Sequence, residues 1–307
     1  MSGHHRLALA ALIMLLGAGC VPPAAPAATW TARAPMSLAR DEFGAAVVAG
    51  KVYTFGGMTG ERGNDLKIVE RYDPAADDWT RLPSLPRARS ALRAGAVGAR
   101  VYLVGGAIRN EPATLVESFD TQTSTFRTEP PLPTARFGHV VVAIGERVYA
   151  IGGFGQRGAT DAVEALDTRS GAWVKLAPLP TPRYNLAAAV LHGQIYAIGG
   201  RSTGDALTTV EIYDPATDRW RPGPSLPEPL ANFDAATVND TIHAVLHSTH
   251  LTLRAGSARW ERAAPLALAR HGLAVVAVGG TLLAIGGCTV GLHDSPVTEA
   301  FAAGPGG

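Results

Sequence analysis

The chain has 307 residues, of which 17% are charged, and its formal net charge at pH 7 is +1. A balance so close to neutral excludes the dense basic surface of a nucleic-acid-binding protein or of a protein that docks on an anionic membrane. The 35 glycines, 22 prolines and two cysteines favour a turn-rich all-β protein and exclude a disulfide framework.

The first twenty residues have the features of an export signal. A short polar start precedes an apolar run from residue 7 to residue 16, which is too short to span a bilayer as a helix. Small residues then lead to Cys20. The segment resembles a bacterial lipoprotein signal, which implies cleavage before Cys20 and lipidation of that cysteine, although Leu16 stands one place earlier than in the usual motif. An ordinary secretory signal peptide is the alternative.

We therefore expect a signal peptide at residues 1–19, then a lipidated Cys20 and a proline- and alanine-rich tether through residue 28. The resemblance implies a periplasmic or cell-surface lipoprotein of a bacterial cell. Val21 follows the cysteine, where lipoproteins held at the inner membrane carry Asp, so the outer membrane is favoured. Attachment to the membrane is expected through the lipid alone, with no transmembrane helix in the mature chain.

From Trp30 onwards one unit is repeated about every 47 residues. Its copies begin at Trp30, Trp79, Phe126, Trp173, Trp220 and Trp260. The position 26 residues later opens a double glycine in every copy except the fifth, which is about seven residues shorter and has Leu246-His247 instead. A repeat of this length indicates a repeat architecture, whatever domain count the chain length alone would suggest.

Each copy is predicted to contain four short strands. In the fourth copy these are residues 186–191, 194–198 and 209–213, and a strand that begins at Trp220. The tight turn His192-Gly193 joins the first two strands, and the second stops at the glycines. An Asp-Pro turn separates the last two.

The double glycine, the spaced Tyr and Trp, and the four strands per unit resemble the Kelch repeat. The resemblance covers about residues 29–301 and implies an all-β, six-bladed β-propeller whose blades stack to bury the faces that one blade cannot bury alone. The last copy stops after its third strand, near Phe301. We expect Trp30 to Arg33 to supply the missing fourth strand. The propeller would then occupy residues 29–303, followed by a tail at 304–307.

Residues that recur in nearly every copy are expected to be structural. Arginine lies ten residues after the aromatic start, at Arg40, Arg89, Arg136, Arg183 and Arg270, with Leu230 in the fifth copy. Glutamate recurs on the third strand, at Glu70, Glu117, Glu164, Glu211 and Glu299. We expect an Arg-Glu pair that holds each blade rather than a ring of anion-binding arginines. The tryptophans are expected to pack between blades, and the glycines to allow a close approach of backbone.

Binding residues are expected where the copies differ, on the face formed by the loop after the double glycine and the connection into the first strand. From the connection we select Asp41, Glu42, Arg93, Tyr184, Asn185, Asn232, Asp234 and His271. From the loop we select Arg109, Phe154, Arg157 and Arg201. Polar groups beside aromatic rings suit a protein or glycan ligand.

Neither a cofactor nor a metal site is expected from the sequence. His243, His247 and His250 are close in sequence but lie on no predicted helix that would bring them together. Cys288 is either a free thiol or a small buried residue, and His139 is expected to pack within a first strand.

The leading interpretation is an exported binding or scaffolding protein that recognises a protein or glycan through this face, with no nucleic-acid partner. The alternative is an enzyme, because exported Kelch propellers include sialic-acid mutarotases, which the chain resembles in repeat type and export. That resemblance would make Glu42 or Asp234 the catalytic base and Arg201 or Arg109 the clamp for the sugar carboxylate. A copper propeller of the galactose-oxidase type is a weaker third possibility, because nothing arranges its Tyr-Cys crosslink or its histidine ligands.

Overall fold

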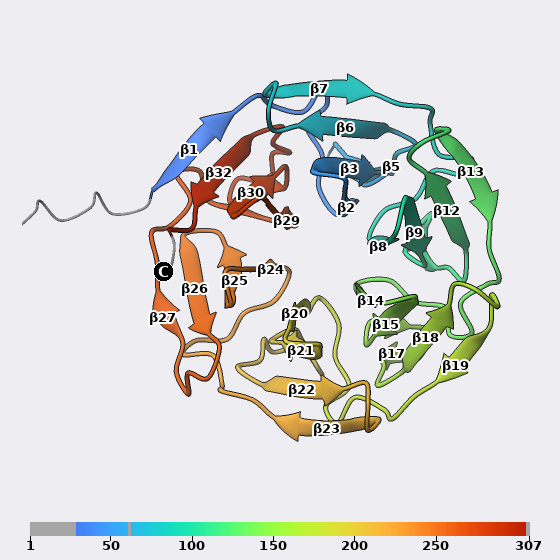
Figure 1. Cartoon of the computed structure of the whole chain (residues 1–307), viewed down its shortest axis with the longest axis vertical. Helices are drawn as coiled ribbons and strands as arrows, with labels where there is room; N and C mark the ends of the chain where they lie inside the picture. Colours follow the sequence, from blue (N-terminus) through green and yellow to red (C-terminus); the bar gives the residue numbers. More distant parts are fainter. Residues whose placement is uncertain (1–28, 61–62, 305–307) are drawn as a thin grey trace, which may run out of the picture.

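The computed structural model describes residues 29–60 and 63–304. The expected signal peptide, Cys20 and its tether, and most of the expected tail, lie outside the described residues. Within these residues the secondary structure consists of strands and turns, and no helix is long and apolar enough to cross a membrane. Figure 1 shows the described four-stranded sheets arranged around one axis as the six blades of a β-propeller, as predicted.

Each blade is an antiparallel sheet whose strands follow one another from the central channel to the rim. Blade one consists of β2 (Gly44–Val48), β3 (Lys51–Phe55), β6 (Val69–Asp73) and β7 (Asp78–Arg81). Blade two consists of β8 (Arg93–Val97), β9 (Arg100–Val104), β12 (Val116–Asp120) and β13 (Thr125–Thr128). Blade three consists of β14 (Val140–Ile144), β15 (Arg147–Ile151), β18 (Val163–Asp167) and β19 (Trp173–Lys175). Blade four consists of β20 (Ala187–Leu191), β21 (Gln194–Ile198), β22 (Val210–Asp214) and β23 (Arg219–Pro222). Blade five consists of β24 (Asp234–Val238), β25 (Thr241–Leu246), β26 (Thr249–Arg254) and β27 (Glu261–Arg262). Blade six consists of β29 (Ala274–Val278), β30 (Thr281–Ile285), β32 (Thr298–Ala302) and β1 (Trp30–Arg33).

Short ribbons extend the loops that follow the double glycines. They are β4 (Met58–Thr59) with β5 (Asn64–Asp65), β10 (Ala107–Ile108) with β11 (Glu111–Pro112), and β16 (Phe154–Gly155) with β17 (Gly158–Ala159). In blade six the loop strand β31 (Cys288–Thr289) pairs instead with β28 (Arg270–His271) of the connection into the first strand. In blade five β25 turns directly into β26 at His247 and Ser248.

The first strand of the propeller completes the last blade. β1 runs antiparallel to β32, with Trp30 opposite Phe301 and Arg33 opposite Thr298. The ring centroids of Trp30 and Phe301 lie 5.3 Å apart. The predicted closure is confirmed, and it joins parts of the chain that are 269 positions apart, as in the bond from Thr31 Oγ1 to the carbonyl of Ala300.

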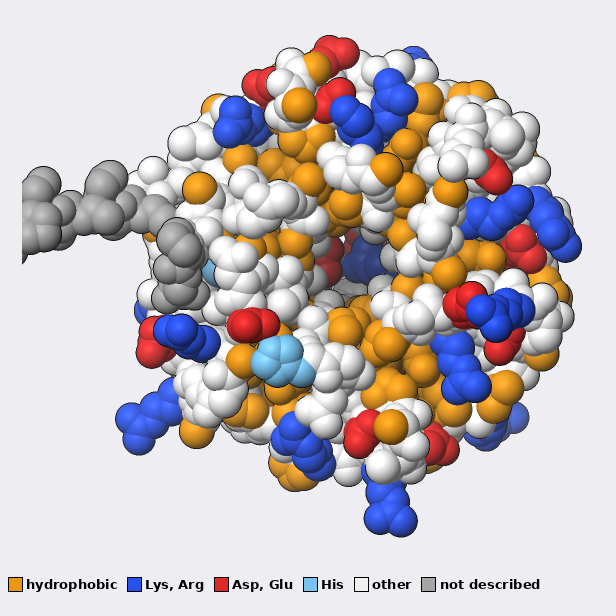
Figure 2. Space-filling view, viewed as in Figure 1, with side chains coloured by type: hydrophobic (Ala, Val, Ile, Leu, Met, Phe, Trp, Pro, Cys, Tyr) orange, Lys and Arg blue, Asp and Glu red, His pale blue; other side chains and the backbone are white. Residues whose placement is uncertain are grey.

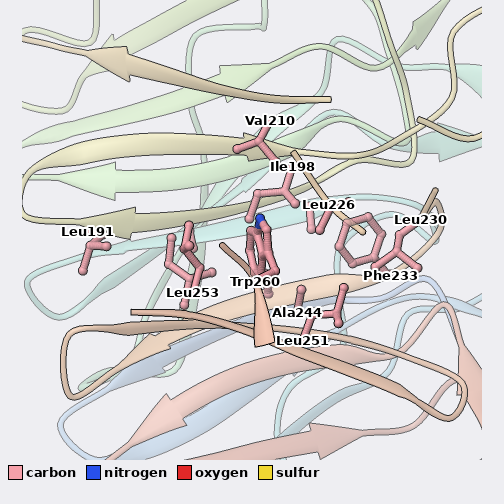
Figure 3. Packing of buried hydrophobic residues seen from close by; sticks show 14 residues of the cluster. Leu191, Ile198, Val210, Leu226, Leu230, Phe233, Ala244, Leu251, Leu253 and Trp260 are labelled. Atoms are coloured by element: carbon pink, nitrogen blue, oxygen red, sulfur yellow. The ribbon is translucent and has the colours of Figure 1, made fainter. Parts of the chain in front are cut away.

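The apolar core lies between neighbouring blades. Figure 3 shows the layer between blades four and five, where Trp260 lies among Ile198 and Val210 of blade four and Leu253 of blade five. Comparable clusters occupy the other contacts between blades. Because each blade supplies one wall of two such layers, no blade buries its apolar surface without both neighbours.

A tryptophan also ties the outer strand of a blade to the blade before it. Trp79 Nε1 donates to the carbonyl of Ala34 at 2.9 Å. The same bond to the preceding blade is made by Trp30, Trp173, Trp220 and Trp260. Blade two has Phe126 at this position, which packs on Phe119 with centroids 4.8 Å apart but has no N–H to donate. The predicted packing role of the tryptophans is confirmed.

Buried Arg-Glu pairs join the inner and outer parts of single blades, as predicted. Arg136 Nη1 donates to Glu164 Oε2 at 2.7 Å, and its Nη2 donates to the carbonyl of Ala150 at 3.0 Å. The equivalent pairs are Arg40 with Glu70, Arg89 with Glu117, Arg183 with Glu211, and Arg270 with Glu299. In blade five both positions carry leucine, Leu230 and Leu251, and both side chains are buried in one apolar cluster.

The double glycines mark close backbone contacts, with the next blade at the first glycine and within the same blade at the second. A Cβ atom on Gly56 would lie 2.6 Å from the carbonyl oxygen of Arg89 in the next blade, and one on Gly57 would lie 2.5 Å from that of Asp41. Both residues also have positive φ, 62° and 96°. A side chain has no room here, which confirms the structural interpretation of the glycines.

Candidate functional site

The inner strands of the six blades surround a channel along the axis of the propeller. A hollow of about 300 Å³ lies in this channel, with walls made mainly of Ala and Val side chains. Arg93, which opens β8, and Asp234, which opens β24, are the charged residues among those that line it. Figure 2 looks along the channel and shows positive and negative side chains at its centre, within a largely apolar surround.

Arg93 and Asp234 occupy equivalent positions in blades that stand opposite one another. Each is the first residue of an inner strand, in blade two and blade five respectively (Figure 1). The same position in the other blades carries Gly44, Val140, Ala187 and Ala274. The repeat thus places one cation and one anion on opposite sides of a ring of small and apolar residues.

The carboxylate of Asp234 is held in place by backbone amides. Its Oδ1 accepts from the N–H of Ala235 and its Oδ2 accepts from the N–H of Val275 in blade six, both at 2.9 Å. Burial raises the pKa of Asp234, and the charge of Arg93 and these two bonds oppose that rise. The group is therefore a fixed carboxyl in surroundings that disfavour its charge.

Two residues before each inner strand, the chain forms a collar at the mouth of the channel. The collar residues are Glu42, Ala91, Gly138, Asn185, Asn232 and Gly272, and all have positive φ, between 48° and 60°. Their backbones bond from blade to blade: Asn232 N–H donates to the carbonyl of Asn185 at 2.8 Å, and Glu42 N–H to that of Gly272 at 2.9 Å. The left-handed conformation suits Gly and Asn, but it strains Glu42 and Ala91.

Glu42 brings a third charged group to the channel mouth. Its side chain is partly buried, and burial raises the pKa of its carboxyl while the positive charge of Arg93 lowers it. The same guanidinium thus acts on both Glu42 and Asp234. Arg93 nevertheless forms no ion pair within 4.0 Å with any described residue. A cation without a direct partner, beside apolar walls, is available to an anionic ligand.

The loop after the double glycine and the connection into the first strand do lie together, as expected. Isolated bridges join Phe137 to Phe154 and Tyr184 to Arg201. The Phe154 ring contacts both aromatic neighbours, with centroid distances of 5.5 Å to Phe137 and 5.0 Å to Tyr184. These three half-buried rings form an aromatic patch where blades three and four meet.

The three arginines predicted from the loops lie away from the channel lining. Arg109 and Arg157 are exposed at ribbon turns, and the Arg109 amide donates to Asp65 Oδ2 at 2.8 Å. Arg201 is half-buried and bonds its own loop, donating from Nη1 to the carbonyl of Gly204 at 2.8 Å. The structure therefore brings Arg93, and neither Arg109 nor Arg201, to the candidate carboxylates.

The histidines form two separate pairs. His271 lies against His247, with 3.1 Å between Nδ1 and Nε2, and burial lowers the pKa of both rings. His243 meets His250 across the β25–β26 hairpin, at 2.9 Å between Nδ1 and Nε2. His139 is buried, which confirms its expected packing role, and burial holds its pKa well below the usual value.

Asp41 separates from its neighbour Glu42 and turns to the seam between blades one and six. It is buried, and burial raises the pKa of its carboxyl to about 7, with further contributions from the charges of Glu42 and Asp294. Cys288 and Asp294 lie beside it. Sequence reasoning missed this group, because 247 positions separate Asp41 from Cys288 and only ring closure brings them together.

Comparison with known proteins agrees with the repeat. The family model described as the KLHDC2/KLHL20/DRC7 Kelch-repeats domain matches residues 42–245 and 91–287. Kelch-like protein terF of Aspergillus terreus is 40% identical over 83 residues, which are 25% of this chain and 18% of that protein. Kelch repeat and BTB domain-containing protein 12 of Homo sapiens is 35% identical over 88 residues, 25% of this chain and 14% of that protein. The chain thus matches less than a fifth of the length of either relative.

Among solved structures, the one titled "Structure of YjhT" superposes with a TM-score of 0.76 at 15% sequence identity, covering 86% of this chain and 95% of that one. At this identity the likeness concerns the fold. Since the family model matches most of the propeller, the chain belongs to the Kelch-repeat family.

Proposed function

We propose that this protein is an exported binding protein that recognises an anionic group of a protein or glycan at the collar end of the channel. The observation that carries the proposal is Arg93, a guanidinium at the channel mouth with no ion-pair partner among the described residues. A carboxylate or sulfate of a ligand would pair with it in surroundings of low polarity, where such a bond is strong. A Kelch propeller suits such a binding or scaffolding role.

The aromatic patch of Phe137, Phe154 and Tyr184 is a second reason to place the binding surface on this face. Aromatic rings offer flat apolar area to a sugar ring or to a peptide side chain, and nearby polar groups fix its orientation. Asn185 of the collar immediately follows Tyr184, so amide and ring come from one connection. We assign the patch to ligand packing and Arg93 to charge recognition.

The test is a glycan and peptide array probed with the purified propeller. We expect capture of ligands that carry a carboxylate or sulfate, with affinity lost at least tenfold in Arg93→Ala and reduced in Tyr184→Ala. Arg219→Ala, on the outer strand β23, is the matched control and should bind as wild type. Equal capture by the Arg93→Ala and Arg219→Ala variants would refute charge recognition at the channel mouth.

Export and lipid anchoring are part of the proposal and rest on the sequence of the first twenty residues. Mass spectrometry of the protein recovered from a bacterial host should find an acylated Cys20 as the first residue, in the outer-membrane fraction. Cys20→Ser should release the protein from the membrane without changing ligand capture. A mature chain that keeps residues before Cys20, or that lacks acyl groups there, would contradict the lipoprotein assignment.

A sugar mutarotase is the second candidate, and one observation favours it. Glu42 and Asp234 are two carboxyls whose pKa values are raised by burial, and the guanidinium of Arg93 opposes that rise in both. Opening a sugar ring needs a base at the anomeric hydroxyl and an acid at the ring oxygen, and a carboxyl of raised pKa suits the acid role. Arg93 would hold the carboxylate of a sialic acid, in place of the loop arginines expected from sequence.

Exchange between the anomers of sialic acid, followed by proton NMR, tests this second candidate. If it is correct, catalytic amounts of protein accelerate exchange, and Glu42→Gln or Asp234→Asn removes most of the acceleration. Both substitutions keep the size of the side chain, and Asp240→Asn on an exposed turn is the control. Exchange at the uncatalysed rate with wild-type protein would leave binding as the function.

A further inference from the structure

We infer that Asp41, Cys288 and Asp294 form a zinc site that joins blade one to blade six. One ligand atom from each residue lies within 4.8 Å of the other two. Asp41 comes from the connection into β2 of blade one, whereas Cys288 begins β31 and Asp294 follows it in the loop of blade six. The group therefore spans the seam at which the ring of blades closes.

One oxygen of the Asp41 carboxylate has no hydrogen-bond partner among the described residues. The residue is 6% exposed, and its Oδ1 is buried with no hydrogen-bond donor among the described residues. A buried carboxylate oxygen without a donor is costly, so native proteins pair such atoms with a proton donor or a cation. Asp41 shares its site with another carboxylate, Asp294, and no described arginine or lysine forms an ion pair with either.

The other two residues are already fixed in orientation. Asp294 Oδ2 accepts from Thr59 Oγ1 at 2.9 Å and from the Gly60 amide at 2.7 Å, so the carboxylate bridges from blade six to β4 of blade one. A carboxylate bonded through one oxygen can bind a metal through the other. Cys288 is buried and forms a backbone β-bridge with Asp294. Among the described residues its Sγ makes one hydrogen bond, to the carbonyl of Thr289 at 3.6 Å.

The donor set selects the class of metal. A thiolate with two carboxylates suits Zn²⁺, which takes Cys sulfur at about 2.3 Å and carboxylate oxygen at about 2.0–2.2 Å. In a tetrahedral site these bonds place ligand atoms about 3.3–3.7 Å apart, so atoms within 4.8 Å of one another need to close by only about 1 Å. A water would complete four-coordination. Hard cations such as Mg²⁺ or Ca²⁺ would not use the sulfur.

Cobalt is the spectroscopic probe for this site. The full chain carrying Cys20→Ser, so that Cys288 is its single thiol, is stripped of metal and titrated with Co²⁺ and then with Zn²⁺. We expect one equivalent of Co²⁺ to give a thiolate-to-cobalt charge-transfer band, and Zn²⁺ to displace it. Zinc at about 100 times its dissociation constant should raise the melting temperature by about 5 °C.

Three variants make the assignment specific. Cys288→Ser should abolish the band, and Asp41→Asn should weaken Co²⁺ binding at least tenfold. Asp205→Asn, an exposed carboxylate in the loop of blade four, is the control and should bind as wild type. The inference is overturned if adding Co²⁺ to the metal-free protein gives no band. It is also overturned if Co²⁺ binding persists in Cys288→Ser, since carboxylates alone would then be holding the ion. The Co²⁺ titration of the protein with its three proposed ligands intact tests the inference without any variant. The test therefore does not depend on whether a variant is stable.

Discussion

Arg136 donates to Glu164 at 2.7 Å inside blade three, and Leu230 and Leu251 take the places of these two residues inside blade five. The strand registers establish the equivalence: Glu164 lies opposite Ala150 on the second strand of its blade, and Leu251 lies opposite Ala244 on the second strand of blade five. Equivalent positions therefore hold a buried ion pair in blade three and two apolar side chains in blade five.

This equivalence predicts the outcome of a double substitution. Arg136→Leu alone leaves the Glu164 carboxylate buried without its cation, and should lower the free energy of unfolding by about 3–5 kcal/mol. Adding Glu164→Leu copies the arrangement of blade five and should recover most of that loss, because no uncompensated charge remains. Urea unfolding of both single variants and the double variant measures the coupling. A double variant less stable than either single variant would show that the pair stabilises beyond charge compensation.

Closure by β1 predicts that Trp30 is a major stabilising residue. Its indole packs on His250 and Phe301 and donates to the carbonyl of Ala264 in blade five. Trp30→Ala should cost about 3–5 kcal/mol, as for other large buried aromatic residues. Trp30→Phe imitates Phe126 of blade two, keeps the packing and loses only the bond, so it should cost about 1 kcal/mol. Thermal unfolding distinguishes the two variants, and equal losses would contradict the role given to packing.

The His243–His250 pair predicts acid sensitivity of blade five. The carbonyl of Ala264 lies 2.9 Å from His250 Nδ1, so this nitrogen carries the hydrogen and the neutral ring accepts from His243 through Nε2. Burial lowers the pKa of His243 from 6.5 to about 4 and also lowers that of His250. The neighbouring rings, Trp30 and Phe301, carry no charge.

Because the folded pKa is below the unfolded one, the unfolded chain binds more protons as the pH falls below 6.5. Stability is therefore complete above pH 6.5 and is lost as the pH falls towards 4, by on the order of 3 kcal/mol for His243. His243→Gln with His250→Gln should flatten the profile of melting temperature against pH in this range. His192→Gln, at an exposed side chain, should leave the profile unchanged.

The collar predicts that Glu42 lowers the stability of the protein but contributes to ligand recognition. Glu42 and Ala91 both have φ of 48°, a left-handed conformation that strains residues other than Gly and Asn. Glu42→Gly and Ala91→Gly should each raise the free energy of unfolding by about 0.5–1 kcal/mol, after the greater freedom of glycine in the unfolded chain is counted. Only Glu42→Gly should also change ligand capture, because Ala91 has no functional group. A loss of stability in Ala91→Gly would show that the backbone is not strained there.

The architecture was predictable because it repeats. The spacing of Trp and double glycine fixed the number of blades, and the incomplete last copy identified Trp30 to Arg33 as its fourth strand, which the pairing of β1 with β32 confirms. The Arg-Glu pairs were recognised for the same reason, since a residue present in most copies serves the contacts that all copies share.

The candidate site was less predictable, because it depends on contacts that occur once. Comparing equivalent positions did select Arg93 and Asp234, but their placement on opposite sides of the channel follows only from counting blades around a closed ring. Arg109 and Arg201 were given a ligand role because they follow the double glycines, yet Arg109 is exposed at a ribbon turn and Arg201 bonds its own loop. The signal available for Asp294 was weak, since an acidic residue in a variable loop is ordinary.

The pairing of β1 with β32 also has a consequence for biosynthesis. The segment that leaves the ribosome before any other part of the propeller finds its partner only after five complete blades have been made. Until then β1 has no partner strand, and closure of the ring must wait for a contact between the most distant parts of the chain. The export that we propose from the first twenty residues would benefit from such a delay, because a translocation pore requires an unfolded chain.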